Sequence, residues 1–169
     1  MENRHCSELH AKVSCAVITV SDTRNKETDK SGRLIIDLLR GAGHSVKMYK
    51  IISDDQPMIQ RTIREATHHR DIEAIMITGG TGIAKRDVTI ESIQPLFDKE
   101  LPGFGELFRM LSFQFDIGSA AILSRAVAGI ANQRIIFSMP GSTGAVKLAM
   151  EMLILPELAH LFQEATKDI

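Results

Sequence analysis

The order of apolar and polar positions along the chain predicts strands that alternate with helices. Val13–Ser21 is a continuous run of β-branched and small residues, which is typical of a strand covered on both faces. The runs 45–52 and 74–78 have the same character. Between these runs apolar residues recur at helical spacing, and we expect Ser31 to cap the first helix and Asp55 to cap the second. This alternation favours a parallel sheet.

The second half of the chain follows a different pattern. A helix is predicted around 104–115, where four of the seven Phe residues fall, as core or as a subunit interface. The runs 126–130 and 134–139 predict two strands joined by a hairpin turn, and an apolar helix from 145 to 155 is expected to break at Pro156. We therefore expect an α/β fold, a three-layer sandwich with a mostly parallel central sheet, helices on both faces and one short antiparallel hairpin.

Length and composition narrow the function. The 169 residues fit a single domain over 13–169 behind a loose polar leader at 1–12. A formal net charge of −1 and few aromatic residues give no basis for binding nucleic acid or an anionic membrane surface. The chain lacks an 18-residue apolar run and an apolar secretion segment, so we expect a cytoplasmic protein. Its two cysteines, Cys6 and Cys15, cannot form a disulfide framework or a zinc site by themselves.

The glycine-rich segment Thr78-Gly79-Gly80-Thr81-Gly82 is the strongest chemical signal. It directly follows an expected strand, and ligands of open parallel sheets bind at the carboxyl ends of strands. Adjacent glycines let a ligand approach the backbone, whose N–H groups, with the Thr81 hydroxyl, form a concave set of donors for phosphate. A tight turn before a helix capped by Thr89 explains the glycines equally well. The common P-loop, dinucleotide-binding and nucleophile-elbow motifs are absent.

Two aspartates suggest a cation beside this segment. Asp87 follows the glycines, and a carboxylate beside phosphate-binding amides is unfavourable unless a cation joins them. Mg²⁺ meets this need, because it is held by one or two carboxylates, several waters and substrate phosphates. Asp54 ends the second expected strand and, unlike Asp55, has no role as a helix cap. We therefore expect Asp54 and Asp87 to meet across the strand tips.

Two further segments end expected strands at the same edge. Ser21-Asp22 follows the first strand, so a third carboxylate faces the same crevice if Asp22 is more than a residue that turns the chain. Pro140-Gly141-Ser142 joins a strand to a helix, where Ser142 either caps the helix or helps to hold an anion.

Six ordered motifs make the sequence resemble the MoaB/Mog family of molybdenum cofactor biosynthesis proteins, over nearly the whole chain and closest to the MoaB branch. The motifs are TVSD at 19–22, ISDD at 52–55, TGGTG…RDVT at 78–89, GFGELFR at 103–109, AILSRAVAGI at 121–130 and MPGST at 139–143. The resemblance implies trimers that can pair as hexamers. It also implies Mg-ATP-dependent adenylylation of molybdopterin, in which the terminal phosphate of the pterin attacks the α-phosphate of ATP and pyrophosphate leaves.

By the same resemblance, Asp54 and Asp87 match the catalytic pair that holds Mg²⁺. The positions expected to bind ATP or molybdopterin are Ser21, Asp22, Thr78, Gly79, Gly80, Thr81, Gly82, Ser124, Arg125, Pro140, Gly141 and Ser142. The main alternative is a molybdopterin carrier of the same pathway that catalyses nothing. Molybdate-insertion and CinA-type proteins contain the same domain in much longer chains, and an unrelated nucleotide-binding protein would not carry six ordered motifs.

Overall fold

The computed structural model describes residues 12–167, so Cys6 and the predicted leader, up to residue 11, lie outside it. Within that range six strands form one sheet in the order β2-β1-β3-β6-β5-β4. The strands are β1 (Ser14–Val20), β2 (Ser45–Ile52), β3 (Ala74–Thr78), β4 (Lys99–Glu100), β5 (Val127–Ala131) and β6 (Arg134–Met139). The first four in spatial order run parallel, whereas β5 pairs antiparallel with both β6 and β4.

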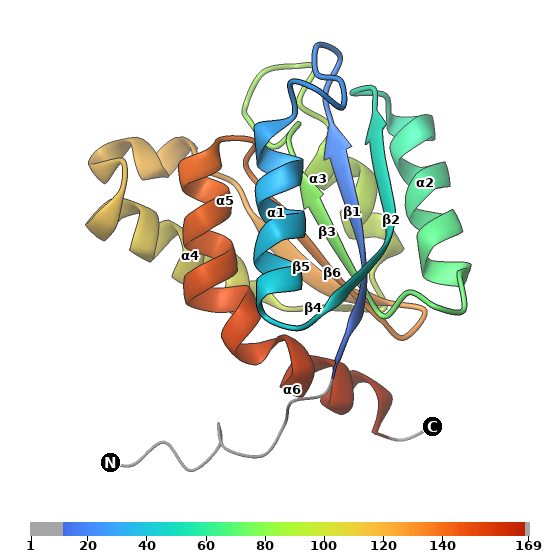
Figure 1. Cartoon of the computed structure of the whole chain (residues 1–169). Helices are drawn as coiled ribbons and strands as arrows, with labels where there is room; N and C mark the ends of the chain where they lie inside the picture. Colours follow the sequence, from blue (N-terminus) through green and yellow to red (C-terminus); the bar gives the residue numbers. More distant parts are fainter. Residues whose placement is uncertain (1–11, 168–169) are drawn as a thin grey trace, which may run out of the picture.

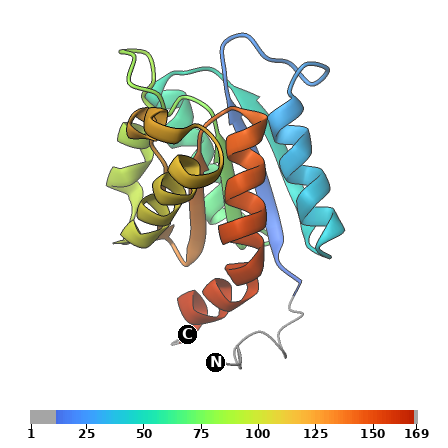
Figure 2. The ribbon, with the colours of Figure 1, turned by 90° about the vertical axis from the view of Figure 1, so that its left-hand side faces the viewer.

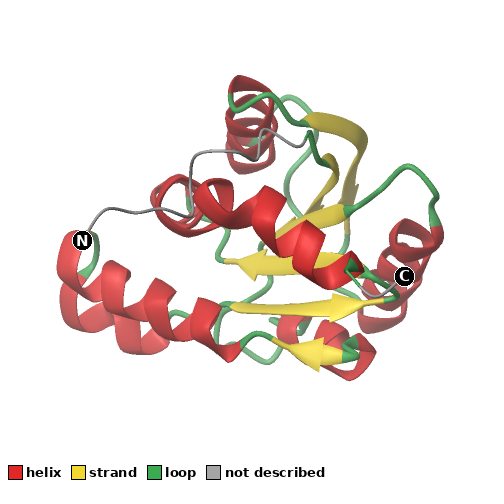
Figure 3. Cartoon of the chain, turned by 90° about the horizontal axis from the view of Figure 1, so that it is seen from below, coloured by secondary structure: helices red, strands yellow, loops and turns green. Residues whose placement is uncertain are grey.

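Helices cover both faces of this sheet (Figures 1 and 3). They are α1 (Lys30–Gly41), α2 (Gln56–His68), α3 (Thr89–Ile93), α4 (Pro102–Phe115), α5 (Thr143–Ala149) and α6 (Leu155–Thr166), with a 3₁₀ segment at Gly118–Leu123 and a π-helical turn at Met150–Ile154. The expected three-layer α/β fold with a mostly parallel sheet is confirmed.

Every strand except the exposed, two-residue β4 divides its side chains between two separate cores. In β1, Cys15 and Val17 pack with α1, α4, α5 and α6, whereas Ala16 and Ile18 pack with α2 and α3. Figure 2 shows α4 and α5 side by side over the first of these faces. Successive side chains of a strand point to opposite faces, so a continuous apolar run is what a strand buried on both faces requires. Cys15 is fully buried, and this burial raises the pKa of its thiol to about 12.

Several local predictions hold. Asp55 caps α2 by accepting a hydrogen bond from the backbone N–H of Met58 at 3.0 Å. The hairpin between β5 and β6 turns at Asn132 and Gln133, whose φ angles of 47° and 62° match the left-handed conformation of a two-residue turn.

Two expectations about helix ends are wrong, and a third holds only in part. Asp29, not Ser31, caps α1, because the Ser31 hydroxyl donates instead to the carbonyl of Gly141 at 2.7 Å. Thr89 is the first residue of α3 and makes no capping bond. The last helical stretch is interrupted by the π-helical turn ahead of Pro156, which lies in the first turn of α6, where its missing N–H costs no hydrogen bond.

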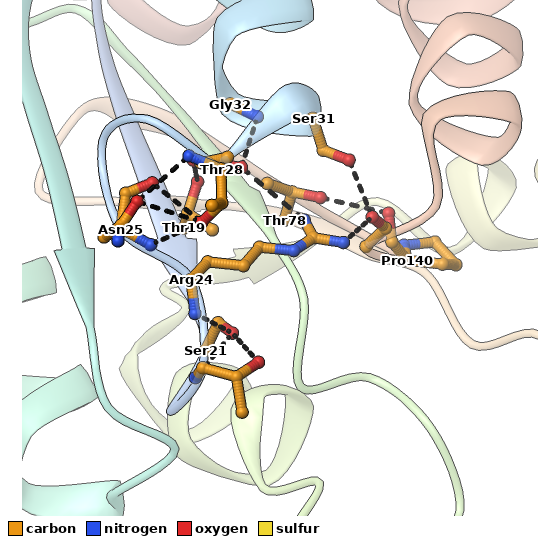
Figure 4. Close-up of polar contacts among 12 residues, drawn as sticks. Thr19, Ser21, Arg24, Asn25, Thr28, Ser31, Gly32, Thr78 and Pro140 are labelled. Carbon is orange, nitrogen blue, oxygen red and sulfur yellow. Dashed lines mark hydrogen bonds and ion pairs between the residues drawn. The ribbon is translucent and has the colours of Figure 1, made fainter.

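Asp29 is a fully buried carboxylate that joins three elements. It accepts hydrogen bonds from Thr19 in β1 at 2.6 Å, from Tyr49 in β2 at 2.7 Å and from the Gly32 amide in α1 at 2.9 Å. The Arg24 guanidinium lies 3.5 Å away and also donates to Gly141. Figure 4 shows Arg24 crossing from the β1–α1 loop toward Pro140.

These contacts determine the charge of Asp29. Burial would raise the pKa of the carboxyl, but the three hydrogen bonds and the nearby guanidinium outweigh it and lower the pKa below the ordinary value of 3.8. A carboxyl whose pKa is lowered in the folded state stabilises the fold above its unfolded pKa, and that contribution is lost as the pH falls through the folded pKa.

We expect Asp29→Asn to lower the free energy of unfolding at pH 7 by about 2 kcal/mol, because the amide cannot accept all of these charge-assisted bonds. Urea denaturation at several pH values measures this difference, which should shrink below pH 4 as the wild-type carboxyl protonates. Asp37→Asn, at an exposed position of the same helix, is the matched control and should stay within about 0.5 kcal/mol. An equal loss in both variants, or a loss independent of pH, would contradict this account.

Candidate functional site

The carboxyl ends of the parallel strands β1, β2, β3 and β6 surround one cavity. Its volume is about 460 Å³, within the range of small-molecule sites. Because the four strands run parallel, the loops that follow them emerge at the same edge of the sheet. The lining residues are Val20, Ser21, Asp22, Thr23, Arg24, Asp54, Gly79, Gly80, Thr81, Gly82, Arg86, Asp87, Ser112, Asp116, Ile117, Ala120, Leu123, Ser124, Arg125, Pro140, Gly141, Ser142 and Ala145.

All the predicted site residues except Thr78 line this cavity. Thr78 is fully buried, and its hydroxyl donates to the carbonyl of Pro140 at 3.0 Å, so it joins the β3 loop to the β6 loop. Ser142 caps α5 by accepting from the Ala145 amide at 3.2 Å, as one of its two expected roles required.

The glycines of the β3–α3 loop are required by close packing. Gly79 and Gly80 have φ angles of 98° and 62°, a region that L side chains rarely adopt. A Cβ on Gly79 would overlap the carbonyl oxygen of Val20, and one on Gly80 would overlap the Thr89 hydroxyl. The loop therefore lies directly against its neighbours, and its backbone lines the cavity with no side chain in between at the glycines.

Backbone donors of this loop are free to bind a ligand. Among residues 12–167, no acceptor pairs with the N–H groups of Gly80, Thr81, Gly82 and Ile83. Unpaired backbone N–H groups in a loop are a recognised binding surface for phosphate oxygens. The predicted phosphate-binding segment thus has both the glycine geometry and the available donors that this chemistry needs.

Three carboxylates lie beside these donors. The backbone N–H of Asp54 donates to Asp22 at 3.1 Å, and Asp87 accepts from the Ala84 amide at 3.0 Å. Asp54 Oδ1 lies 2.5 Å from the point that a Cβ on Gly80 would occupy, and Asp87 Oδ2 lies 2.6 Å from the equivalent point at Gly82. Both carboxylates therefore lie against the glycine loop, as the sequence led us to expect.

Of these three carboxylates, that of Asp54 has the least favourable surroundings. Its Oδ1 is buried and has no hydrogen-bond partner among the described residues, and the Thr89 hydroxyl nearby has none either. Burial, with the charges of Asp22 and Asp87, raises the pKa of the Asp54 carboxyl above its ordinary value. A carboxylate with one buried, unpaired oxygen beside like charges is unfavourable, so this position suits a cation or a hydrogen-bond donor.

The donor set fits Mg²⁺ held jointly with a substrate. The described residues contain no group of three or more His, Cys, Asp or Glu side chains arranged to enclose a metal ion. Mg²⁺ does not require such a group, because it keeps several waters and takes one or two carboxylates together with phosphate oxygens. Asp54 and Asp87, beside phosphate-binding amides, are a suitable pair for that mode of binding.

Cationic side chains on the cavity wall were partly missed from the sequence. Arg24 and Arg86 both line it, and Arg24 is fixed by Asp29 and by the Gly141 carbonyl. The only sequence signal for Arg24 is its place two residues after Asp22. Residues of α4 and the following 3₁₀ segment, such as Ser112 and Leu123, carry no local signal, because tertiary packing brings them to the wall.

The fold agrees with the comparison of the chain with known families. Residues 16–160 match the family described as "Probable molybdopterin binding domain". The match covers most of the chain, and the chain belongs to this family of molybdopterin-binding domains.

Individual relatives place the chain in the MoaB branch. It is 57% identical to molybdenum cofactor biosynthesis protein B of Bacillus subtilis (strain 168) over 97% of this chain and 96% of that protein. A crystal structure of molybdenum cofactor biosynthesis protein B superposes with a TM-score of 0.92 at 52% identity, covering 94% of this chain and 98% of the other. The molybdopterin biosynthesis enzyme MoaB of Thermus thermophilus gives 0.81 at 32% identity, covering 92% and 98%. No helix within residues 12–167 is long and apolar enough to cross a membrane.

We expect Asp54→Asn to raise the thermal midpoint at pH 7 by about 2–4 °C, equivalent to about 1 kcal/mol, because it removes a charge that burial and the neighbouring carboxylates disfavour. A raised folded pKa means that the ionised form destabilises the fold at pH values above it, so the gain should vanish as the pH falls toward 3.8 and the wild-type carboxyl protonates. Thermal scans at several pH values measure the effect. Asp71→Asn, at an exposed position, is the control. If Asp54→Asn lowers the thermal midpoint, the charge of Asp54 does not destabilise the fold and this account is wrong.

Proposed function

We propose that this protein catalyses Mg-ATP-dependent adenylylation of molybdopterin. The terminal phosphate of the pterin forms a bond to the α-phosphorus of ATP, the bond to the β-phosphate oxygen breaks, and pyrophosphate leaves with that electron pair. The observation that carries the proposal is the unpaired, buried Oδ1 of Asp54 beside the free N–H groups of the glycine loop. Family membership supplies the pterin, and the relative from Thermus thermophilus is described as an enzyme of molybdopterin biosynthesis.

The proposed reaction depends mainly on how the two substrates are positioned. A phosphate monoester is already anionic at neutral pH, so it attacks without a general base, and the barrier lies in bringing two anions together in line. In the proposed reaction, the amides of Gly80–Gly82 bind phosphate oxygens of ATP. Asp54 and Asp87 would hold Mg²⁺, which neutralises charge on the phosphates when bound.

The other wall of the cavity is suited to the pterin. Pro140–Ser142 line it beside Arg24, which carries a fixed positive charge. A guanidinium held by a buried carboxylate needs no reorganisation when an anion arrives, which favours binding of the terminal phosphate. We therefore assign the β3 loop to ATP and the β6 loop with Arg24 to molybdopterin.

A homo-oligomer, a trimer or a hexamer, is the second part of the proposal. Phe104 and Phe108 belong to the core, but Phe113 and Phe115 of the same helix are 62% and 63% exposed. The remaining exposed apolar residues of α4 and the 3₁₀ region are Leu107, Met110, Ile117, Ile122 and Leu123. An apolar surface of this kind is typical of a protein–protein interface, and a second copy of the chain is the occupant we propose.

We expect Asp87→Asn to lower the rate of adenylylation at least about 100-fold, because the proposed role of Asp87 depends on its negative charge. Since Asp87 lies in a loop, the thermal midpoint should change by no more than a few degrees. The assay incubates protein, molybdopterin, ATP and Mg²⁺ and separates the pterin products by chromatography. Asp71→Asn is the control for surface charge.

Three outcomes decide between the candidates. Adenylylated molybdopterin that is lost in Asp87→Asn supports the enzyme. Molybdopterin retained on the wild-type protein with no adenylylated product would favour a carrier. A fully active Asp87→Asn protein would refute the metal assignment.

We expect Phe113→Ser to shift the protein from oligomer toward monomer, because it removes an exposed aromatic side chain from the proposed contact surface. Light scattering coupled to size-exclusion chromatography measures the mass. Lys47→Ser, at an exposed position of β2 on the opposite edge of the sheet, is the control. A wild-type chain that is monomeric at micromolar concentration would contradict the proposal.

A further inference from the structure

Arg125 donates hydrogen bonds mainly to the backbone of the glycine loop. Its Nε donates to the carbonyl of Thr81 at 2.9 Å, and its Nη2 donates to the carbonyl of Gly82 at 2.7 Å and more weakly to that of Asp87 at 3.4 Å. Its Nη1 is paired with the carboxylate of Glu91 in α3. One planar guanidinium thus holds three carbonyls of the segment that carries the phosphate donors and the carboxylate of Asp87.

These bonds also orient the N–H groups of the loop. In a trans peptide the C=O and the N–H of the same unit point in opposite directions. When the carbonyls of Thr81 and Gly82 point at Arg125, the amides of Gly82 and Ile83 point away from it. Neither amide has an acceptor among residues 12–167.

Glu91 fixes the guanidinium from its outer side. The hydrogen bond from Arg125 lowers the pKa of the Glu91 carboxyl, so this carboxyl is ionised at neutral pH. Its side chain is half exposed, and ion pairs at such positions add little to stability. The pair is therefore better suited to setting geometry than to holding the fold together.

We propose that Arg125, held by Glu91, is a positioning residue that orients the 81–87 loop toward a bound phosphate and does not itself contact the substrate. This inference rests on the proposed function for the identity of the ligand. Family resemblance alone placed Arg125 among the substrate-binding residues, whereas its hydrogen bonds give it a different task. The bonds are matched to the fork of a guanidinium, which lysine cannot reproduce.

The isosteric substitution Glu91→Gln, which removes only the negative charge, separates the two roles by the sign of its effect. If Arg125 contacted phosphate, removing the competing carboxylate would free its charge and tighten the binding of MgATP. If Arg125 positions the loop, the same substitution loosens the guanidinium and weakens binding. We expect the Kd for MgATP, measured by calorimetry, to rise about threefold in Glu91→Gln and about tenfold or more in Arg125→Lys.

Activity adds a second readout. We expect Arg125→Lys to raise KM for ATP and to lower kcat, because Asp87 shifts with the loop, while the thermal midpoint changes by no more than about 2–4 °C. Glu65→Gln, which breaks the similarly exposed pair with Lys50 outside the cavity, is the matched control and should leave all of these values unchanged.

Backbone NMR of the ligand-free protein tests the positioning without any turnover. The amide resonances of Gly82 and Ile83 should shift in Arg125→Lys, and that of Gly41, outside the cavity, should not. Unmoved loop resonances, or tighter MgATP binding in Glu91→Gln, would overturn the inference. A wild-type protein that binds neither ATP nor molybdopterin would refute the proposed function instead, and the amide shifts would still decide the role of Arg125.

Discussion

The buried carboxylate of Asp29 is the contact on which the arrangement of the site depends. It collects hydrogen bonds from β1, β2 and the first turn of α1, and through Arg24 it reaches the loop after β6. A charge with no exposed surface persists in a fold only when each of its lone pairs is well used. The sheet, the helix and two loops of the cavity are therefore fixed relative to one another by one side chain that has no contact with the cavity itself.

The opposite condition holds at Asp54, where a buried oxygen is left without a partner. A single substitution of Asp54 by asparagine would remove this unfavourable charge, so the presence of an aspartate at this position is informative about the site. Folded proteins tolerate such groups mainly at functional sites, where a ligand completes what the chain leaves open. Asp29 and Asp54 show the two uses of a carboxylate in the same molecule. In the first the protein itself satisfies the charge, and in the second one oxygen is left without a partner, which is the position we propose for the metal ion.

Much of the fold could be predicted because its signals are local. The apolar runs at 13–21, 45–52 and 74–78 become buried strands, since a run with no polar alternation has to be covered on both faces. The glycine loop and the acidic residues could be predicted to meet, because parallel strands end at one edge. Contacts between segments that are distant in sequence could not be predicted. The role of Asp29 could not be predicted, because this residue lies among other charged residues of a loop and nothing near it in sequence indicates Thr19 and Tyr49 as partners. The two-residue strand β4 is exposed and carries no pattern of its own.

The close packing of Gly79 has a consequence for how the protein can be altered. Its Cα lies 3.3 Å from the point that a Cβ on Gly141 would occupy, and a Cβ of its own would meet the carbonyl of Val20. Segments from the beginning, middle and end of the chain are thus in backbone contact at one point. This arrangement of the cavity loops therefore requires that β1, β3 and β6 lie side by side in the sheet. A binding loop transplanted from a distant homologue would fit only together with the two loops that it contacts. We therefore expect these three loops to be exchangeable between homologues only as a set.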